Sequence, residues 1–188
     1  MRKKEARALF RAKRAAITDA EANRWNDLLL ISFQQAGLPF VAKVLSYYPS
    51  GEKGEVDTFL LTRYLAFSNP GVAIAFPRIT TDFGIDAIVP DSEEDFVPNA
   101  YDILEPATGL KLEPEEVDLV LVPLLAYDLQ GNRAGYGKGY YDRFLAACRP
   151  DCLKVGLSYF EPVSLLEDTH EFDIPLDLCI TPSKVYVF

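Results

Sequence analysis

The sequence contains a single histidine, His170, among its 188 residues. Serine triads, metalloprotease sites and metal sites with two histidines would each have to be built around this one imidazole, which disfavours those classes of enzyme. An enzyme of this composition is expected to work by positioning its substrates and stabilising charge. Phosphoryl transfer is such a reaction, because its transition state requires mainly cations and a metal ion.

Cysteines and long apolar runs are also scarce. Cys148, Cys152 and Cys179 lack the paired spacing of a zinc site or a redox motif, and their odd number fits free thiols in a reducing compartment. No stretch approaches the roughly 18 consecutive apolar residues of a membrane-spanning helix, and the N-terminus lacks the apolar core of a secretory signal. We therefore expect a cytoplasmic protein with no membrane partner. The alternative is that the basic N-terminus is an organelle transit peptide.

Charge is distributed unevenly along the chain. The formal net charge is -9, from 19 basic and 28 acidic side chains, yet residues 1–14 contain seven Lys and Arg residues and one Glu. An acidic body argues against a nucleic-acid partner, because phosphate backbones require a basic footprint. The basic segment by itself leaves a basic-helix interaction module as one alternative function.

The apolar spacing predicts alternating helices and strands. Helical spacing covers residues 3–16, 19–37, 56–67 and 140–148, and the second helix begins at a capping box formed by Thr18 and Glu21. Apolar or β-branched runs predict strands at 41–48, 72–76, 117–125, 154–159 and 178–181, with two short strands around 86–89. This alternation predicts an α/β fold, with a single domain over residues 1–188 and an open, mostly parallel, Rossmann-like sheet covered by helices on both faces.

A glycine-rich segment at 131–139 carries the strongest functional signal. Its four glycines lie after a predicted strand and before a predicted helix, where backbone N–H groups and a helix N-terminus can approach a phosphate. Arg133 and Lys138 add two cations, but the spacing is not that of the Walker loop, because Lys138 is followed by Gly139. A flexible surface turn is the alternative interpretation. Asp142, in the first helical turn, is either a favourable charge at the helix N-terminus or a magnesium ligand.

Residues 131–145, Gly-Asn-Arg-Ala-Gly-Tyr-Gly-Lys-Gly-Tyr-Tyr-Asp-Arg-Phe-Leu, closely resemble the signature of the 5-formyltetrahydrofolate cyclo-ligase family, also called methenyltetrahydrofolate synthetase. Further matches follow in family order at Lys3 and Arg7 and at residues 55–58, 76–78, 103–106, 123–128 and 173–177. The resemblance covers nearly the whole chain and implies an open α/β fold shared with sugar-phosphate isomerases and coenzyme A transferases. It implies ATP- and magnesium-dependent conversion of 5-formyltetrahydrofolate into 5,10-methenyltetrahydrofolate, through phosphorylation of the formyl oxygen and attack by N10, with release of ADP and phosphate.

The resemblance also implies roles for individual residues. The implied catalytic residues are Lys138, Arg133 and Tyr140. The implied ATP ligands are Lys3, Lys4, Arg7, Arg133, Ala134, Gly135, Tyr136, Gly137, Lys138, Gly139, Tyr140 and Tyr141. The implied contacts to the folate substrate are Arg7, Glu55, Tyr101, Tyr136, Gly137, Lys138, Gly139 and Tyr140, although Tyr101 could equally be a core or surface tyrosine. The implied magnesium ligands are Asp142 and Asp173.

Two other functions remain open on this scaffold. One is a non-catalytic, folate-binding or regulatory relative, which the intact Lys138, Asp142 and Asp173 argue against. The other is a sugar-phosphate or coenzyme A enzyme, which the pair of Lys3 and Arg7 argues against. We expect a monomer whose partners are the small molecules 5-formyltetrahydrofolate and ATP. The basic N-terminal segment is then best interpreted as part of the active site.

Overall fold

A computed structural model describes residues 1–188 with the exception of 93 and 101. Its α-helices are α1 (Lys3–Ala15), α2 (Asp19–Gln35), α3 (Thr58–Ser68) and α4 (Tyr140–Ala147), with short 3-10 helices η1 (Gly51–Lys53) and η2 (Pro114–Glu116). Its strands are β1 (Lys43–Leu45), β2 (Ala73–Ile79), β3 (Ile85–Val89), β4 (Phe96–Pro98), β5 (Leu104–Pro106), β6 (Leu110–Leu112), β7 (Leu119–Val122), β8 (Ala126–Tyr127), β9 (Arg133–Ala134), β10 (Leu153–Leu157), β11 (Leu178–Ile180) and β12 (Val185–Val187).

The main sheet has eight strands in the order β12-β11-β10-β7-β1-β2-β3-β6. Strands β11, β10, β7, β1 and β2 run parallel, while β12, β3 and β6 join the two edges antiparallel. The predicted α/β class with a mostly parallel sheet is confirmed. The antiparallel edge strands β6 and β12 were not predicted.

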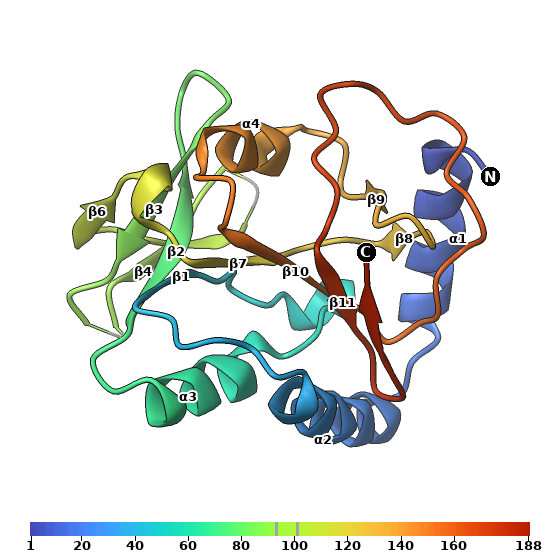
Figure 1. Ribbon diagram of the computed structural model, residues 1–188, viewed down its shortest axis with the longest axis horizontal. Coiled ribbons are helices and arrows are strands. Elements are labelled where there is room, and N and C mark those ends of the chain that lie inside the picture. Colours follow the sequence, from blue (N-terminus) through green and yellow to red (C-terminus); the bar gives the residue numbers. More distant parts are fainter. Residues whose placement is uncertain (93, 101) are drawn as a thin grey trace.

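The central strand β7 shows how the sheet is buried on both faces. All four of its residues are buried. Leu119 and Leu121 pack into a core cluster with residues of α2 and α3, whereas Val120 and Val122 pack into a second cluster with α4. Successive side chains of a strand point to opposite faces, so a continuously apolar strand requires cover on both sides. Figure 1 shows α2 and α3 below the sheet and α4 above it.

Proline decides where β7 ends. The sequence predicts one strand over residues 117–125, but the structure has β7 as far as Val122 and the separate short strand β8 from Ala126. Pro123 lies between them, and it has no N–H to continue the ladder. Strand β8 pairs with β9 as a small hairpin immediately before the glycine-rich loop.

Helix α1 lies beside β8 and β9 (Figure 1). Ala6 and Phe10 are buried against Leu125, Ala126 and Ala134. Two basic residues of the same helix, Lys3 and Arg14, are each only 7% exposed, so part of the positive charge of the N-terminal segment points into the protein. The helix thereby brings cations to the carboxyl ends of the parallel strands, the edge at which α/β sheets usually bind ligands.

The predicted capping box of α2 is present. Thr18 Oγ1 accepts a hydrogen bond from the backbone N–H of Glu21, and Glu21 Oε2 accepts one from the N–H of Thr18. The three cysteines are free thiols. Within the described residues, no helix combines the length and the apolar character that crossing a membrane requires.

Candidate active site

A cavity of about 390 Å³ opens where the parallel strands end. Its wall is formed by α1, the segment after β1, strand β2, the β5 region and the loop between β9 and α4. The predicted site residues on this wall are Lys3, Arg7, Glu55, Arg133, Gly135, Tyr136, Gly137, Lys138, Gly139, Tyr140, Tyr141, Asp142 and Asp173. Folding therefore gathers most of them in one place, although they are spread over residues 3–173.

Two predicted residues do not line this cavity, and a third lies outside the part of the chain that the structure describes. Lys4 is exposed on α1 and is not part of the cavity wall. Ala134 is fully buried in β9, where its side chain packs against α1, so its role in the structure is packing. Tyr101 lies outside the described residues. The ATP-binding roles of Lys4 and Ala134 stay predictions that the geometry of this cavity does not support directly.

The glycine-rich loop wraps around Arg7. Arg7 Nε donates a hydrogen bond of 2.7 Å to the carbonyl oxygen of Gly135. Gly137 lies against the Arg7 guanidinium and has a φ of +92°, a left-handed conformation that favours glycine at this position. Gly139, with a φ of +73°, is the N-cap of α4. The loop thus presents backbone groups, a guanidinium and a helix N-terminus to the same space.

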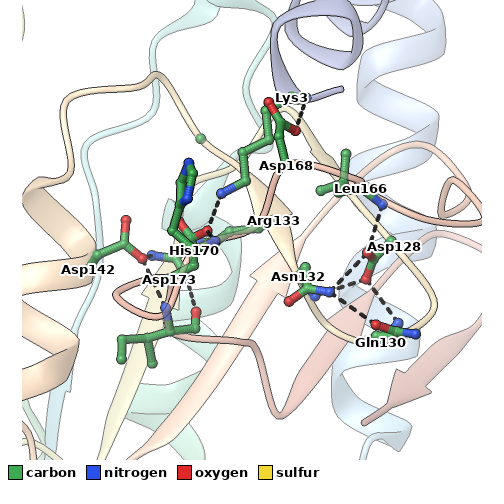
Figure 2. A network of polar contacts seen from close by, with 12 residues as sticks. Lys3, Asp128, Gln130, Asn132, Arg133, Asp142, Leu166, Asp168, His170 and Asp173 are labelled. Atoms are coloured by element: carbon green, nitrogen blue, oxygen red, sulfur yellow. Dashed lines mark hydrogen bonds and ion pairs between the residues drawn. The ribbon is translucent and has the colours of Figure 1, made fainter. Parts of the chain in front are cut away.

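Lys3 and Asp173 form one of two ion pairs at this end of the cavity (Figure 2). Lys3 Nζ lies 2.5 Å from Asp173 Oδ2, which also accepts a hydrogen bond of 2.6 Å from the backbone N–H of His170. Burial raises the pKa of the Asp173 carboxyl, but the hydrogen bonds from Lys3 and His170 outweigh burial and leave this pKa below its ordinary value. The backbone N–H of Lys3 is bound in turn by Asp168 at 2.6 Å.

Arg133 and Asp142 form the second pair. Arg133 Nη2 lies 2.7 Å from Asp142 Oδ1, and the Arg133 side chain is only 5% exposed. The same guanidinium donates to the carbonyl oxygen of Ile174, while Asp142 Oδ1 accepts the backbone N–H of Ile174 at 3.1 Å. Burial lowers the pKa of Arg133, and the neighbouring Asp142 carboxylate opposes that shift. Figure 2 shows both ion pairs side by side. The contacts of Ile174 join the second pair to the segment that carries Asp173.

The two carboxylates fit a magnesium ion bound together with phosphates. Asp142 and Asp173 both line a second hollow of about 280 Å³, together with Lys3, Arg7 and His170. The hydrogen bonds and ion pairs described above use one oxygen of each carboxylate. In the described part of the chain, no group of three or more His, Cys, Asp or Glu side chains could hold a metal ion. Magnesium commonly takes only one or two carboxylates beside phosphate oxygens and water, so this donor set suits it.

The opposite end of the cavity is aromatic and apolar, with one carboxylate held in place. Tyr136 donates a hydrogen bond to Glu55 Oε1, and the backbone N–H of Ser50 donates one of 2.9 Å to Oε2. Tyr48 packs against Phe96 with a ring-centroid distance of 5.1 Å. The loop at residues 48–54, for which the sequence indicates no individual contacts, places Tyr48, Ser50 and Lys53 on the wall.

Three tyrosines give this wall neutral hydrogen-bonding groups. Burial is the main cause that raises the pKa of Tyr47, Tyr136 and Tyr141, so each hydroxyl keeps its proton at neutral pH. The hydroxyl of Tyr141 is buried and has no hydrogen-bond partner among the described residues. Buried polar atoms are normally paired, so an orphaned hydroxyl on a cavity wall is suited to a ligand.

Sequence reasoning missed two buried charged residues near the cavity. Glu105 lines the wall, is 8% exposed, and accepts hydrogen bonds from the backbone N–H of Ile79 at 3.0 Å and from Asn99 Nδ2 at 2.7 Å. Its segment, residues 103–106, is one of the matches to the family, but the resemblance implied no role for Glu105 itself. Arg14 lies behind the wall and contacts Tyr136. The sequence did contain a signal for Arg14. At helical spacing, Arg14 lies on the same face of α1 as Lys3, which is a predicted site residue.

Comparisons with known proteins agree on one family. The sequence profile of the 5-formyltetrahydrofolate cyclo-ligase family matches residues 1–182. A 5-formyltetrahydrofolate cyclo-ligase from Haemophilus influenzae is 32% identical over 141 residues, which cover 72% of this chain and 73% of that protein. The protein of the same name from Mycoplasma genitalium is 26% identical over 182 residues, covering 94% and 97%.

Solved structures show the same likeness. The NMR structure of Aquifex aeolicus 5,10-methenyltetrahydrofolate synthetase aligns with a TM-score of 0.81 and 32% sequence identity, over 100% of this chain and 93% of that one. A 5,10-methenyltetrahydrofolate synthetase from Mycoplasma pneumoniae aligns with a TM-score of 0.77 at 24% identity, over 97% and 99%. The second likeness shows the fold alone.

Proposed function

Since the chain belongs to the 5-formyltetrahydrofolate cyclo-ligase family, as its glycine-rich signature indicates, we propose that it converts 5-formyltetrahydrofolate into 5,10-methenyltetrahydrofolate at the cost of one ATP. The observation that carries the proposal is a single cavity with two chemically different ends. One end gathers cations, glycines and a helix N-terminus, and the other presents tyrosines, apolar side chains and the Glu55 carboxylate.

The cationic end suits the phosphates of ATP. Lys3, Arg7, Arg133 and Lys138 all line it, and the N-cap of α4 lies among them. Lysine and arginine side chains and helix N-termini are the groups that commonly bind phosphate in proteins. Lys3 and Arg133 are paired with Asp173 and Asp142, so the carboxylates hold these cations in place before a polyphosphate arrives.

The other end suits the pterin and the formyl group. A carboxylate such as Glu55 can accept paired N–H donors from the ring, and flat aromatic walls can cover its faces. The hydroxyls of Tyr136 and Tyr141 add neutral hydrogen-bonding groups. Because both ends belong to one cavity, a folate bound here would place its formyl group next to the glycine-rich loop.

The chemistry then needs no protein nucleophile. The formyl oxygen attacks the γ-phosphorus of ATP and ADP leaves, so the formyl carbon becomes an electrophilic iminium carbon that carries a phosphate. N10 attacks this carbon and closes the ring, N10 loses its proton to solvent, and the C–O bond breaks to release phosphate. A single histidine is no obstacle to this route, because catalysis by positioning and charge stabilisation dominates phosphoryl transfer.

Specific roles follow for the residues of the loop. Lys138 contributes positive charge to the transferred phosphoryl group, Arg133 orients its oxygens, and Tyr140 donates a hydrogen bond from the start of α4. Asp142 and Asp173 would hold magnesium, which neutralises phosphate charge when bound. We also propose that the protein acts as a cytoplasmic monomer on these small molecules and binds neither nucleic acid nor membrane. Its net charge of -9 supports the absence of nucleic-acid and anionic membrane partners, and its free cysteines support a reducing compartment.

The test is direct. Purified protein is mixed with 5-formyltetrahydrofolate, ATP and magnesium, and the near-ultraviolet absorbance of 5,10-methenyltetrahydrofolate is followed. We expect a rise that requires ATP and is accompanied by equimolar release of phosphate. No ATP-dependent rise would overturn the proposal. Binding of 5-formyltetrahydrofolate without turnover, measured by calorimetry in the same samples, would identify a non-catalytic relative instead.

A further inference from the structure

Arg14 is a buried cation that the proposed reaction does not use. It lies in the last turn of α1, is 7% exposed, and is not part of the cavity wall. Its Nη2 donates to the carbonyl oxygen of Leu124, just after β7, and its Nη1 donates to the hydroxyl of Tyr136 at 3.2 Å. Among the described residues, Nε has no hydrogen-bond partner. Burying a guanidinium is costly, so its retention here calls for an explanation.

The hydrogen bonds from Arg14 run in one direction only. A guanidinium can donate but never accept, so the Tyr136 oxygen must be the acceptor in its contact with Arg14. The single proton of Tyr136 is therefore directed to Glu55 Oε1. Burial, followed by the neighbouring Glu55 carboxylate, raises the pKa of Tyr136, so the hydroxyl keeps the proton that this bond needs.

This chain holds Glu55 in one orientation. Tyr136 binds Oε1, and the backbone N–H of Ser50 binds Oε2 at 2.9 Å. Each oxygen of a carboxylate can accept more than one hydrogen bond, so both oxygens retain the capacity to accept N–H donors from a ligand. Without Arg14, the Tyr136 hydroxyl could turn away from Glu55, and one of the two anchors of the carboxylate would be lost.

We propose that Arg14 is a positioning residue for the folate substrate, acting through Tyr136 to hold Glu55 ready for the N–H groups of the pterin. The inference rests on the proposed function, because it assumes that 5-formyltetrahydrofolate occupies the Glu55 end of the cavity. The competing explanation is structural: Arg14 fastens α1 to the end of β7 through the carbonyl oxygen of Leu124. A structural role would disturb every ligand on α1, whereas a positioning role would act on the folate alone.

A double-mutant cycle separates the two explanations. The variants are Arg14→Met, Tyr136→Phe, the double variant, and Arg14→Lys, with Arg24→Met on the exposed surface of α2 as the matched control. Steady-state KM values are measured for both substrates, at temperatures below the unfolding transition of each variant. We expect Arg14→Met to raise the KM for 5-formyltetrahydrofolate about tenfold and to change the KM for ATP less than about twofold.

The cycle also predicts non-additivity. The double variant should have a KM for 5-formyltetrahydrofolate less than about twofold above that of Tyr136→Phe alone, because Tyr136→Phe already removes the hydroxyl that links Arg14 to Glu55. Arg14→Lys keeps the charge and can donate to Tyr136, so we expect it to recover part of the loss. Arg24→Met should match the wild type. If Arg14→Met does not fold, the same cycle with Arg14→Lys separates the positioning role from the structural role. We then expect Arg14→Lys to raise the KM for 5-formyltetrahydrofolate about threefold.

Three results would overturn the inference. An Arg14 variant that raises both KM values alike, or that has its full effect in the Tyr136→Phe background, would show a purely structural role. An Arg14 variant with the kinetics of the wild type would remove Arg14 from substrate positioning altogether. Loss of the proposed function itself would look different, because the wild type would then show no ATP-dependent turnover.

Discussion

Replacing Asp128 by asparagine should reveal how the loops of the site are held together. Asp128 follows β8 and is fully buried. Its Oδ1 accepts the backbone N–H groups of Gln130 at 2.9 Å and Asn132 at 3.0 Å, and its Oδ2 accepts Asn132 Nδ2 and the backbone N–H of Leu166, both at 3.0 Å (Figure 2). One carboxylate thus joins the turn before β9 to the segment that leads to Asp173.

The expected loss follows from counting acceptors. Asparagine has one acceptor oxygen, so two of the four hydrogen bonds are lost and the new NH2 group faces other N–H donors. Each hydrogen bond to a charged group is worth about 1.5 to 3 kcal/mol, so we expect the loss of two of them in Asp128→Asn to lower the free energy of unfolding by about 3 to 6 kcal/mol. For a domain of this size, that corresponds to a fall of roughly 6 to 24 °C in Tm.

Thermal and urea unfolding followed by circular dichroism measure this loss. Asp151→Asn is the matched control, because the Asp151 side chain is 77% exposed and pairs with Arg149 at the surface. The control should change the free energy of unfolding by less than about 1 kcal/mol. We also expect Asp128→Asn to raise the KM for ATP, since Asp173 and its partner Lys3 lose their support. An Asp128→Asn variant as stable as Asp151→Asn would refute this account of how the loops are anchored.

Three further predictions concern the cavity. Lys138→Ala should lower kcat on the order of 100- to 1,000-fold in the absorbance assay, as for the loss of one transition-state donor, and near-normal turnover would remove Lys138 from the mechanism. Lys3→Met should raise the KM for ATP about tenfold. The same variant should lose less stability on acidification than the wild type. The pKa of Asp173 is lowered in the folded protein, so Asp173 contributes stability above its unfolded pKa, and this stability disappears as the pH falls through the folded pKa, between about pH 5 and pH 2. Acid unfolding curves of Lys3→Met that coincide with those of the wild type would contradict this. Glu105→Gln should raise the KM for 5-formyltetrahydrofolate about tenfold with little change in Tm, because a glutamine oxygen can still accept the hydrogen bonds from Ile79 and Asn99; an unchanged KM would leave Glu105 a purely structural residue.

Local patterns in the sequence account for much of the fold. The helix from Asp19 begins at the capping box that Thr18 and Glu21 predict, and the apolar run at Leu119–Val122 forms the buried central strand β7. These features are local, because a cap and a short period each depend on residues close together in the chain. The short strands β8 and β12 escaped prediction, because each is defined by its pairing with a neighbouring strand.

The candidate site divides in the same way. The glycine-rich segment at 131–139, with Arg133 and Lys138, is continuous in the sequence, so its composition predicts a phosphate-binding loop and its residues resemble the signature of the family. Which charges pair could not be read from it. Lys3 meets Asp173 across 170 positions of the chain, and this contact exists only because α1 packs at the ends of the parallel strands.

What the sequence by itself determined is therefore the fold class, the family and the position of the loop that we propose binds phosphate. What only the tertiary structure decided is how the charges are used: Lys3 held by Asp173, Arg133 held by Asp142, and Arg14 turned inward toward Tyr136. The physical reason is the range of the interactions. Caps, periods and glycine conformations depend on neighbouring residues, whereas burial and charge pairing depend on which distant segments the folded sheet brings together.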